Sequence, residues 1–225
     1  MYVSRGSFWS SMPPVVKNLV IINAIMMGIT YLARAFMIEK FALFYFESPF
    51  FQPYQYVSHM FMHGNIVHLL FNMYALVIFG MVLEQIWGSK KFLIYYLATG
   101  LGAALLHTLV LHIEATSLIN AYEAGNFALL GDIQTLLGTP TVGASGAVYG
   151  VLLAYGMLFP NNVLQLIFPP IALKAKWFVI IFGVIELSLG IYNPGSNVAH
   201  FAHLGGMIFG FFLILYWKKR NKMYY

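Results

Sequence analysis

Cysteine is absent from this 225-residue sequence, and only 8% of the residues carry a charge. Without cysteine the chain has no disulfide, no thiol nucleophile and no cysteine-ligated metal site. The single aspartate, Asp132, excludes the paired aspartates of an aspartyl protease. The formal charge of +5 is distributed between apolar segments and forms no single basic patch, so we expect no nucleic-acid partner.

Apolar residues make up 60% of the chain, and the mean hydropathy is +0.77. These values indicate a multi-pass membrane protein rather than a soluble domain. Each crossing of a ~30 Å hydrocarbon core needs roughly 20 mainly apolar residues. We therefore predict an all-α, six-helix membrane bundle in a single domain, 1–225, with spans at 17–38, 66–86, 92–113, 144–159, 177–191 and 198–217.

The basic residues indicate the orientation of these spans. Apart from Arg34 and Lys40, they all fall on one predicted side of the membrane: Arg5, Lys17, Lys90, Lys91, Lys174, Lys176, Lys218, Lys219, Arg220 and Lys222. By the positive-inside rule, both termini are cytoplasmic. Together with the compact size, this suits a bacterial plasma membrane. The long outer segments 39–65 and 114–142 are expected to lie partly in the membrane interface.

The fourth span is unusually short. From Ser145 to Phe159 it has fifteen residues, which rise roughly 22 Å as a helix. Its outer end must therefore start below the membrane surface, and residues 138–143 must enter the bilayer as irregular backbone. Such backbone is tolerated only where protein or a water-filled cavity surrounds it. We predict a buried, wet cavity at Ser145.

Ser145 lies in the motif Gly143-Ala144-Ser145-Gly146, at the expected N-terminus of that helix. Unpaired backbone N–H groups and the helix dipole favour developing negative charge there, as acyl transfer to a serine requires. Alone, the motif is weak, because small residues in membrane helices usually serve close packing. A neighbouring base is needed to favour catalysis.

His203 is the candidate base. It lies near the outer end of the sixth span, about 60° from Gly206 and about 20° from Gly210 around the helix. These glycines, with Gly146 and Gly150 on the fourth span, would let the helices approach closely enough for His203 to hydrogen-bond Ser145. A neutral imidazole near its usual pKa suits proton abstraction from serine.

We predict a Ser-His dyad, because no acidic third member is evident. Glu186, in the fifth span, has no obvious link to His203 and receives no role. Tyr149, one turn after Ser145, either packs against the imidazole and orients it or belongs to the ordinary aromatic core.

Further polar residues lie at the outer start of the second span. His68 and Asn72 share a helix face, and their side chains could stabilise an oxyanion together with the Ser145 N–H. His59 and His63 have metal-ligand spacing but lack the Glu of a His-Glu-x-x-His motif. We therefore expect no metal, and expect these two histidines to hydrogen-bond within the outer loop.

Two polar residues within the predicted spans, Glu84 and His107, are expected to support the fold rather than the chemistry. Glu84 lies near the inner end of the second span and is expected to pair with a lysine. His107, in the third span, is expected to be a hydrogen-bonded packing residue.

The sequence resembles the rhomboid intramembrane proteases over nearly its whole length. The resemblance lies in the order and spacing of three motifs: His63-Gly64-Asn65 with His68 and Asn72, Gly143-Ala144-Ser145-Gly146 with Tyr149, and Ala202-His203-Leu204-Gly205-Gly206. The Trp-Arg pair of some family members is replaced by Tyr54-Gln55, which puts the anchoring of the first outer loop in question.

The resemblance implies a six-helix bundle with a water-filled active site that opens outward. It implies Ser145 as nucleophile, His203 as base, and His68 and Asn72 as oxyanion donors. Transmembrane protein substrates would be cut within or beside their spans, without a metal, cofactor or ATP. Mobile outer structure near the fifth span would gate substrate entry. The oligomeric state is left open.

The alternative is a non-catalytic membrane protein, either a transporter or a client-binding protein. Intramembrane histidines such as His68, His107 and His203 would serve it equally well. It would not account for a serine that starts a truncated helix beside glycines. Covalent labelling of Ser145 by a serine-directed phosphonate separates the two interpretations, because transport needs no activated serine.

Overall fold

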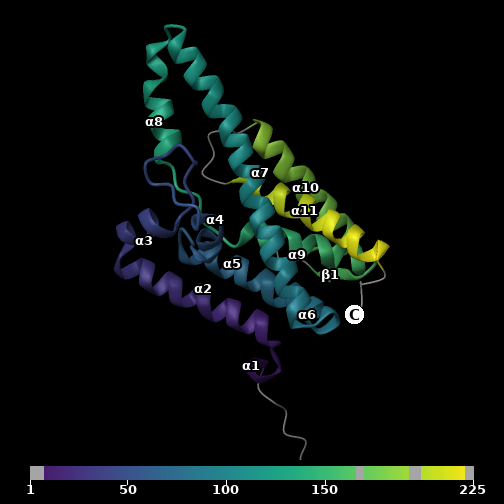
Figure 1. The fold of residues 1–225 in the computed structure, drawn as a ribbon. Coiled ribbons are helices and arrows are strands. Elements are labelled where there is room, and N and C mark those ends of the chain that lie inside the picture. The colour runs from purple at the N-terminus through teal and green to yellow at the C-terminus, as the bar shows by residue number, and fades with distance from the viewer. Residues whose placement is uncertain (1–7, 166–169, 193–198, 221–225) are drawn as a thin grey trace, which may run out of the picture.

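The computed structural model describes residues 8–165, 170–192 and 199–220, which form a bundle of helices (Figure 1). In chain order, the elements are α1 (Phe8–Ser11), α2 (Pro14–Leu32), α3 (Arg34–Phe41), α4 (Gln55–Ser58), the 3₁₀ turn η1 (His59–Phe61), α5 (Ile66–Ala75), the π-helical turn η2 (Leu76–Gly80), α6 (Met81–Trp87), α7 (Ser89–Glu123), the 3₁₀ turn η3 (Phe127–Leu129), α8 (Leu130–Gly138), α9 (Ser145–Leu158), β1 (Val163–Gln165), β2 (Ala172–Lys174), α10 (Ala175–Tyr192) and α11 (His200–Lys219).

Within the described residues, five helical runs are long and apolar enough to cross a membrane. They are α2, the continuous run from α5 to α6, α7, α10 and α11. The remaining predicted span, the fourth, is α9, whose 14 residues rise roughly 21 Å, short of a ~30 Å hydrocarbon core. The prediction of an all-α polytopic bundle with a short fourth helix is confirmed.

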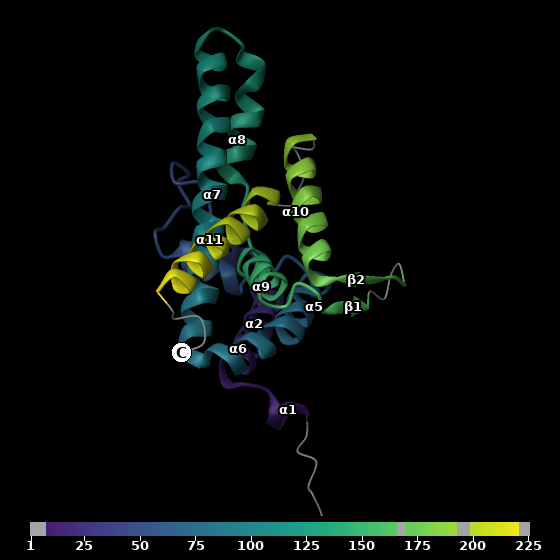
Figure 2. The same cartoon turned by 90° about the vertical axis from the view of Figure 1, so that its right-hand side faces the viewer.

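α9 lies inside the bundle, where it packs against α7, α10 and α11 (Figure 2). Glycines make these contacts close. A side chain at Gly150 would overlap Thr99 of α7, and a side chain at Gly210 would overlap the Tyr95 hydroxyl. That hydroxyl donates a 2.8 Å hydrogen bond to the Gly150 carbonyl. Gly150 and Gly210 therefore face α7, rather than each other as the sequence had suggested.

The first predicted span is interrupted. Pro14 starts α2, as suits a residue whose missing N–H costs nothing in a first helical turn. The helix ends at Leu32, because Ala33 leaves the helical conformation (φ −137°, ψ 52°), and α3 begins at Arg34. The predicted end at residue 38 is therefore wrong. Nothing in the sequence marks Ala33 as the break.

The third predicted span, 92–113, lies within a much longer helix. α7 has 35 residues, roughly 52 Å, because no glycine or proline occurs between Gly102 and Gly125. Gly125, with φ of 104°, ends the extension. α8 then returns along α7 in a helical hairpin that projects beyond the rest of the bundle (Figure 1). Most of segment 114–142 is thus helical.

The connection between the fourth and fifth spans holds a two-stranded antiparallel hairpin, in which Leu164 of β1 pairs with Leu173 of β2. At the sixth span, α11 is described from His200 to Lys219, and Val198, its predicted first residue, lies outside the described residues.

Glu84 is buried, but its partners among the described residues are not lysines. Its carboxylate accepts hydrogen bonds from the backbone N–H groups of Val15 (2.9 Å) and Val16 (2.8 Å) and from the Ser89 hydroxyl (2.7 Å). The expected lysine pair is therefore wrong. A carboxylate at the N-terminus of α2 satisfies unpaired amides and complements the helix dipole.

Gln55 anchors the first outer loop, although the sequence put this anchoring in question. The side chain is fully buried. Its oxygen accepts from the N–H groups of Gln52 (3.1 Å) and Phe44 (3.4 Å), and its amide nitrogen donates to the Phe50 carbonyl (3.0 Å). One side chain thus fixes the loop between α3 and α4.

Candidate active site

Ser145 is the first residue of α9, and the irregular segment before it is held by the first outer loop. Leu43 and Thr141 form an antiparallel bridge, with N–H to carbonyl distances of 2.9 and 2.8 Å. Gly143 donates its N–H to the His59 carbonyl at 3.0 Å. Its φ of 139° favours glycine, and a Cβ there would lie 3.0 Å from the His68 ring. The loop thus fixes where the helix begins.

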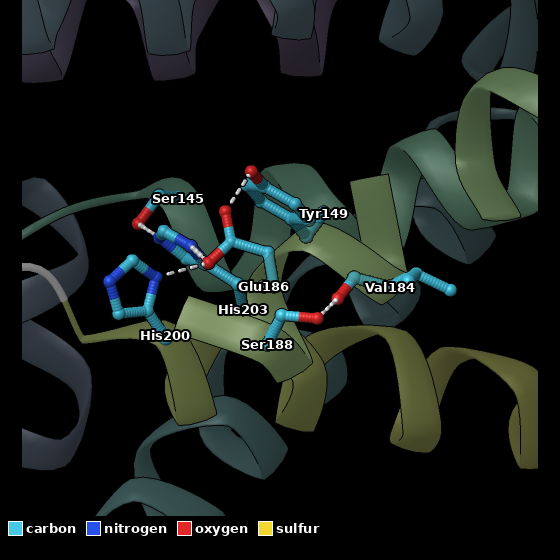
Figure 3. Close-up of polar contacts among 7 residues, drawn as sticks. All are labelled: Ser145, Tyr149, Val184, Glu186, Ser188, His200 and His203. Carbon is cyan, nitrogen blue, oxygen red and sulfur yellow. Dashed lines mark hydrogen bonds and ion pairs between the residues drawn. The ribbon is translucent and has the colours of Figure 1, made fainter. Parts of the chain in front are cut away.

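His203 of α11 meets Ser145, as predicted. Its Nε2 lies 2.8 Å from the Ser145 Oγ (Figure 3). Two glycines permit this contact, because a side chain at Gly206 would overlap the Gly146 carbonyl of α9. Gly146 also faces Ala103 of α7. The imidazole is buried, with 8% of its residue surface exposed.

The Tyr149 ring stacks on the His203 ring. The ring centroids are 4.3 Å apart and the planes differ by 4°. Of the two interpretations of Tyr149, the geometry agrees with packing against the imidazole. Such stacking restricts rotation of the imidazole about its side-chain bonds.

Glu186 of α10 reaches the same imidazole, which corrects the view that it has no link to His203. Its Oε2 lies 2.9 Å from His203 Nδ1, although the ring N–H is not aligned on the oxygen as a hydrogen bond requires. The same Oε2 lies 2.7 Å from His200 Nδ1. Oε1 accepts a short hydrogen bond from the Tyr149 hydroxyl. Figure 3 shows these side chains converging on one carboxylate.

The signal for Glu186 in the sequence was a lone carboxylate within an apolar run. Its partners depend on how α10 is turned against α11, which hydropathy does not specify. His200 was missed for the same reason.

The predicted oxyanion donors lie on α5, and the His68 ring is near Ser145. The space beside Gly143 is bounded by the His68 ring and the Ser145 Oγ, which lie 3.0 and 3.3 Å from the position a Gly143 Cβ would take. Asn72 is buried and donates one amide hydrogen to the His68 carbonyl at 3.0 Å. The other amide hydrogen is not used in that bond.

The remaining histidines differ in their partners. The His59 ring bonds the Gln55 carbonyl at 2.9 Å, as expected for a loop residue, and His107 Nε2 lies 2.9 Å from the Thr141 hydroxyl. His63 is buried, and neither of its ring nitrogens has a hydrogen-bond partner among the described residues. The expected hydrogen bond of His63 is therefore wrong; its ring packs edge-on against His68.

Burial lowers the pKa of His59 to about 4 and that of His63 to about 3, because both rings lose the water that would solvate a charge. Both rings are neutral at physiological pH. They therefore act as packing and hydrogen-bonding groups of the loop.

One group of described side chains has donor atoms close enough together to hold a metal ion. It consists of Glu186, His200 and His203, whose ligand atoms lie within 4.8 Å of one another. His59 and His63, which have metal-ligand spacing in the sequence, are not part of it. Glu186 Oε2 lies 2.7 Å from His200 Nδ1 and 2.9 Å from His203 Nδ1, and both distances are typical of direct N–H···O contacts.

Comparison with known proteins identifies the family. The Rhomboid domain model matches residues 51–220. The chain is 31% identical over 159 residues to Rhomboid protease AarA of Providencia stuartii, covering 70% of this chain and 53% of that protein. It is 33% identical over 162 residues to RHOMBOID-like protein 2 of Arabidopsis thaliana, covering 72% and 41%, and 29% identical over 156 residues to Rhomboid protease GluP of Bacillus subtilis, covering 67% and 23%.

These alignments span about half or less of the relatives' own lengths. The family match, in contrast, covers most of this chain and includes Ser145 and His203. The chain belongs to the rhomboid family.

Proposed function

We propose that this protein is an intramembrane serine endopeptidase in which Ser145 is the nucleophile and His203 its general base. The observation that carries the proposal is the 2.8 Å contact between Ser145 Oγ and His203 Nε2 at the start of a short helix inside a membrane bundle. A serine hydroxyl is a poor nucleophile until a neighbouring base accepts its proton. This pair has the reach that the transfer requires.

In the proposed reaction, Ser145 Oγ attacks the scissile carbonyl while its proton moves to His203 Nε2. The resulting imidazolium then donates this proton to the leaving amine, which breaks the peptide bond and leaves an acyl-enzyme. Water, deprotonated by the same Nε2, attacks the acyl carbonyl, and the imidazolium returns this proton to Ser145 Oγ as the ester bond breaks and the acid product leaves. The proton balance closes on His203, and these steps use no metal or cofactor.

The oxyanion of each tetrahedral intermediate would be stabilised by the Ser145 backbone N–H at the N-terminus of α9, by the His68 ring and by the free amide hydrogen of Asn72. His68 and Ser145 border the same space beside Gly143, which supports this assignment. Loss of one such donor costs roughly 10²- to 10³-fold in kcat.

The substrates would be membrane proteins cut within or beside their transmembrane segments, because Ser145 lies among helices that are long and apolar enough to cross a membrane. Two relatives bear the name rhomboid protease, which supports this substrate class. The basic residues at the inner ends of the helices favour cytoplasmic termini. We propose the bacterial plasma membrane as its location.

The test is cleavage of a single-span reporter protein by purified enzyme in liposomes. Wild type is compared with Ser145→Ala and His203→Ala, and each variant is checked for an unchanged melting temperature. We expect cleavage by wild type alone. Equal cleavage by either folded variant contradicts the assignment of that residue, and a folded wild type that neither cuts nor reacts with a phosphonate favours the non-catalytic alternative.

A further inference from the structure

The side chain of Glu186 is the only carboxylate that the described structure places against Ser145 or His203. It is 6% exposed, in the middle of a helix that is long and apolar enough to span a membrane. A buried carboxylate in such a helix is costly and usually serves a function. Its cost here is offset by hydrogen bonds with Tyr149 of α9 and His200 of α11, and by the close approach of His203 Nδ1 at 2.9 Å.

We propose that Glu186 is a positioning residue for His203, so that the catalytic unit is a Ser-His-Glu constellation assembled from α9, α11 and α10. This inference rests on the proposed function and deepens it. The described hydrogen bonds and ion pairs of Glu186 reach Tyr149, His200 and His203 but not Ser145, so it acts through the imidazole.

The first effect of Glu186 on catalysis is to favour one tautomer of His203. For Nε2 to accept the Ser145 proton, the neutral ring must carry its hydrogen on Nδ1. Glu186 Oε2, at 2.9 Å, is the acceptor beside Nδ1. When Nε2 takes the serine proton, the ring becomes cationic inside a low-dielectric bundle, and the adjacent carboxylate stabilises that charge while remaining unprotonated.

The second effect of Glu186 is to orient the His203 ring. Tyr149 covers one face of the imidazole, and its hydroxyl is held by Glu186 Oε1. One carboxylate thus lies against the edge of the His203 ring and holds the tyrosine stacked on its face. His200 bonds Oε2 from the other side at 2.7 Å and keeps the carboxylate in place.

These contacts predict the result of Glu186→Gln. Three donors converge on the two carboxylate oxygens, whereas a glutamine amide has one oxygen and one NH₂ group. The glutamine NH₂ group would then face at least one of these donors, and the neutral His203 ring would no longer favour carrying its hydrogen on Nδ1. We expect kcat to fall roughly 10²- to 10⁴-fold with KM changed less than about 3-fold, as for loss of the carboxylate in other serine triads.

The experiment compares wild type, Glu186→Gln, Glu186→Asp and the control Ser188→Ala in liposomes. Ser188 is exposed on the same helix, and its hydroxyl bonds only the Val184 carbonyl among the described contacts (Figure 3). Reporter cleavage gives kcat and KM, reaction with a serine-directed phosphonate gives the reactivity of Ser145, and thermal unfolding checks the fold. Ser145→Ala sets the background.

We expect Glu186→Gln to lower kcat and the phosphonate rate together, Glu186→Asp to recover part of both because it retains the charge, and Ser188→Ala to match wild type. A folded Glu186→Gln variant with wild-type kcat and phosphonate rate overturns the proposal. Should Glu186→Gln fail to fold, Glu186→Asp decides: lowered kcat at unchanged KM supports the proposal, and wild-type rates overturn it. Failure of the proposed function is distinct, because Ser145→Ala would then cleave as wild type does.

Discussion

Gly206→Ala is expected to abolish most activity while leaving the protein folded, because the contact between α9 and α11 has no space for one methyl group. A Cβ at Gly206 would lie 2.8 Å from the Gly146 carbonyl carbon, whereas ordinary contacts begin at 3.4 Å. The helices must therefore separate by at least the 0.6 Å difference. The carbonyl oxygen is closer still, so the required shift exceeds about 1 Å, and a misplacement of this size costs roughly 10²-fold in rate.

The same shift acts on the bond between His203 and Ser145. Lengthened by about 1 Å from 2.8 Å, it would no longer be a hydrogen bond. Overpacking of this kind typically costs about 1–3 kcal/mol of stability, which a folded bundle tolerates. We therefore expect kcat to fall about 100-fold or more, with a melting temperature lowered by only several degrees.

The assay is reporter cleavage in liposomes, with Gly28→Ala as the matched control. Gly28 is also a glycine of a spanning helix, but a Cβ there meets nothing within 4 Å. We expect Gly28→Ala to cleave at the wild-type rate. If Gly206→Ala cleaves as fast as Gly28→Ala, the argument that glycine packing positions His203 is wrong.

Four further predictions concern the loop, the helix cap, pH and metal. Gln55→Ala, which leaves buried N–H groups unpaired, should cost about 3 kcal/mol and lower the melting temperature by roughly 5–10 °C, whereas the exposed Gln52→Ala should not. Glu84→Gln should destabilise the fold by about 2 kcal/mol in denaturant unfolding, because an NH₂ group would face donors at the start of α2. The melting temperature should fall as the pH is lowered from 6.5 toward 4, because His59 and His63 bind protons in the unfolded chain but stay neutral in the folded protein. His63→Phe should make the melting temperature depend less on pH, and an unchanged dependence would contradict the reasoning. EDTA should leave the cleavage rate unchanged, and loss of activity that zinc restores would instead indicate a metal at Glu186, His200 and His203.

The sequence predicted those features that depend on local pattern. The apolar runs predicted the helices, and the shortness of the run after Ser145 predicted a helix that does not cross the full bilayer. Gly206 and Gly146 predicted the close approach of α9 and α11, because only small residues allow backbones to meet. Ser145 and His203 were brought together in this way.

Features that depend on the turn and register of helices were not predictable from pattern. The contact of Glu186 with His203 requires one rotational setting of α10, and hydropathy leaves that rotation free. The break at Ala33 has no local signal, whereas the length of α7 could have been found from the absence of glycine and proline before Gly125. The sequence also predicted a hydrogen bond for the loop histidine His63, and the described structure contains none.

The central claim is that His203 activates Ser145, and the most direct measurement is the site of covalent reaction with a serine-directed phosphonate. Purified protein in liposomes is treated with the probe, digested and mapped by mass spectrometry. The account predicts a single adduct on Ser145 that His203→Ala abolishes while the protein stays folded. An unmodified Ser145 in folded wild type, or equal labelling of Ser145 in His203→Ala, would contradict it.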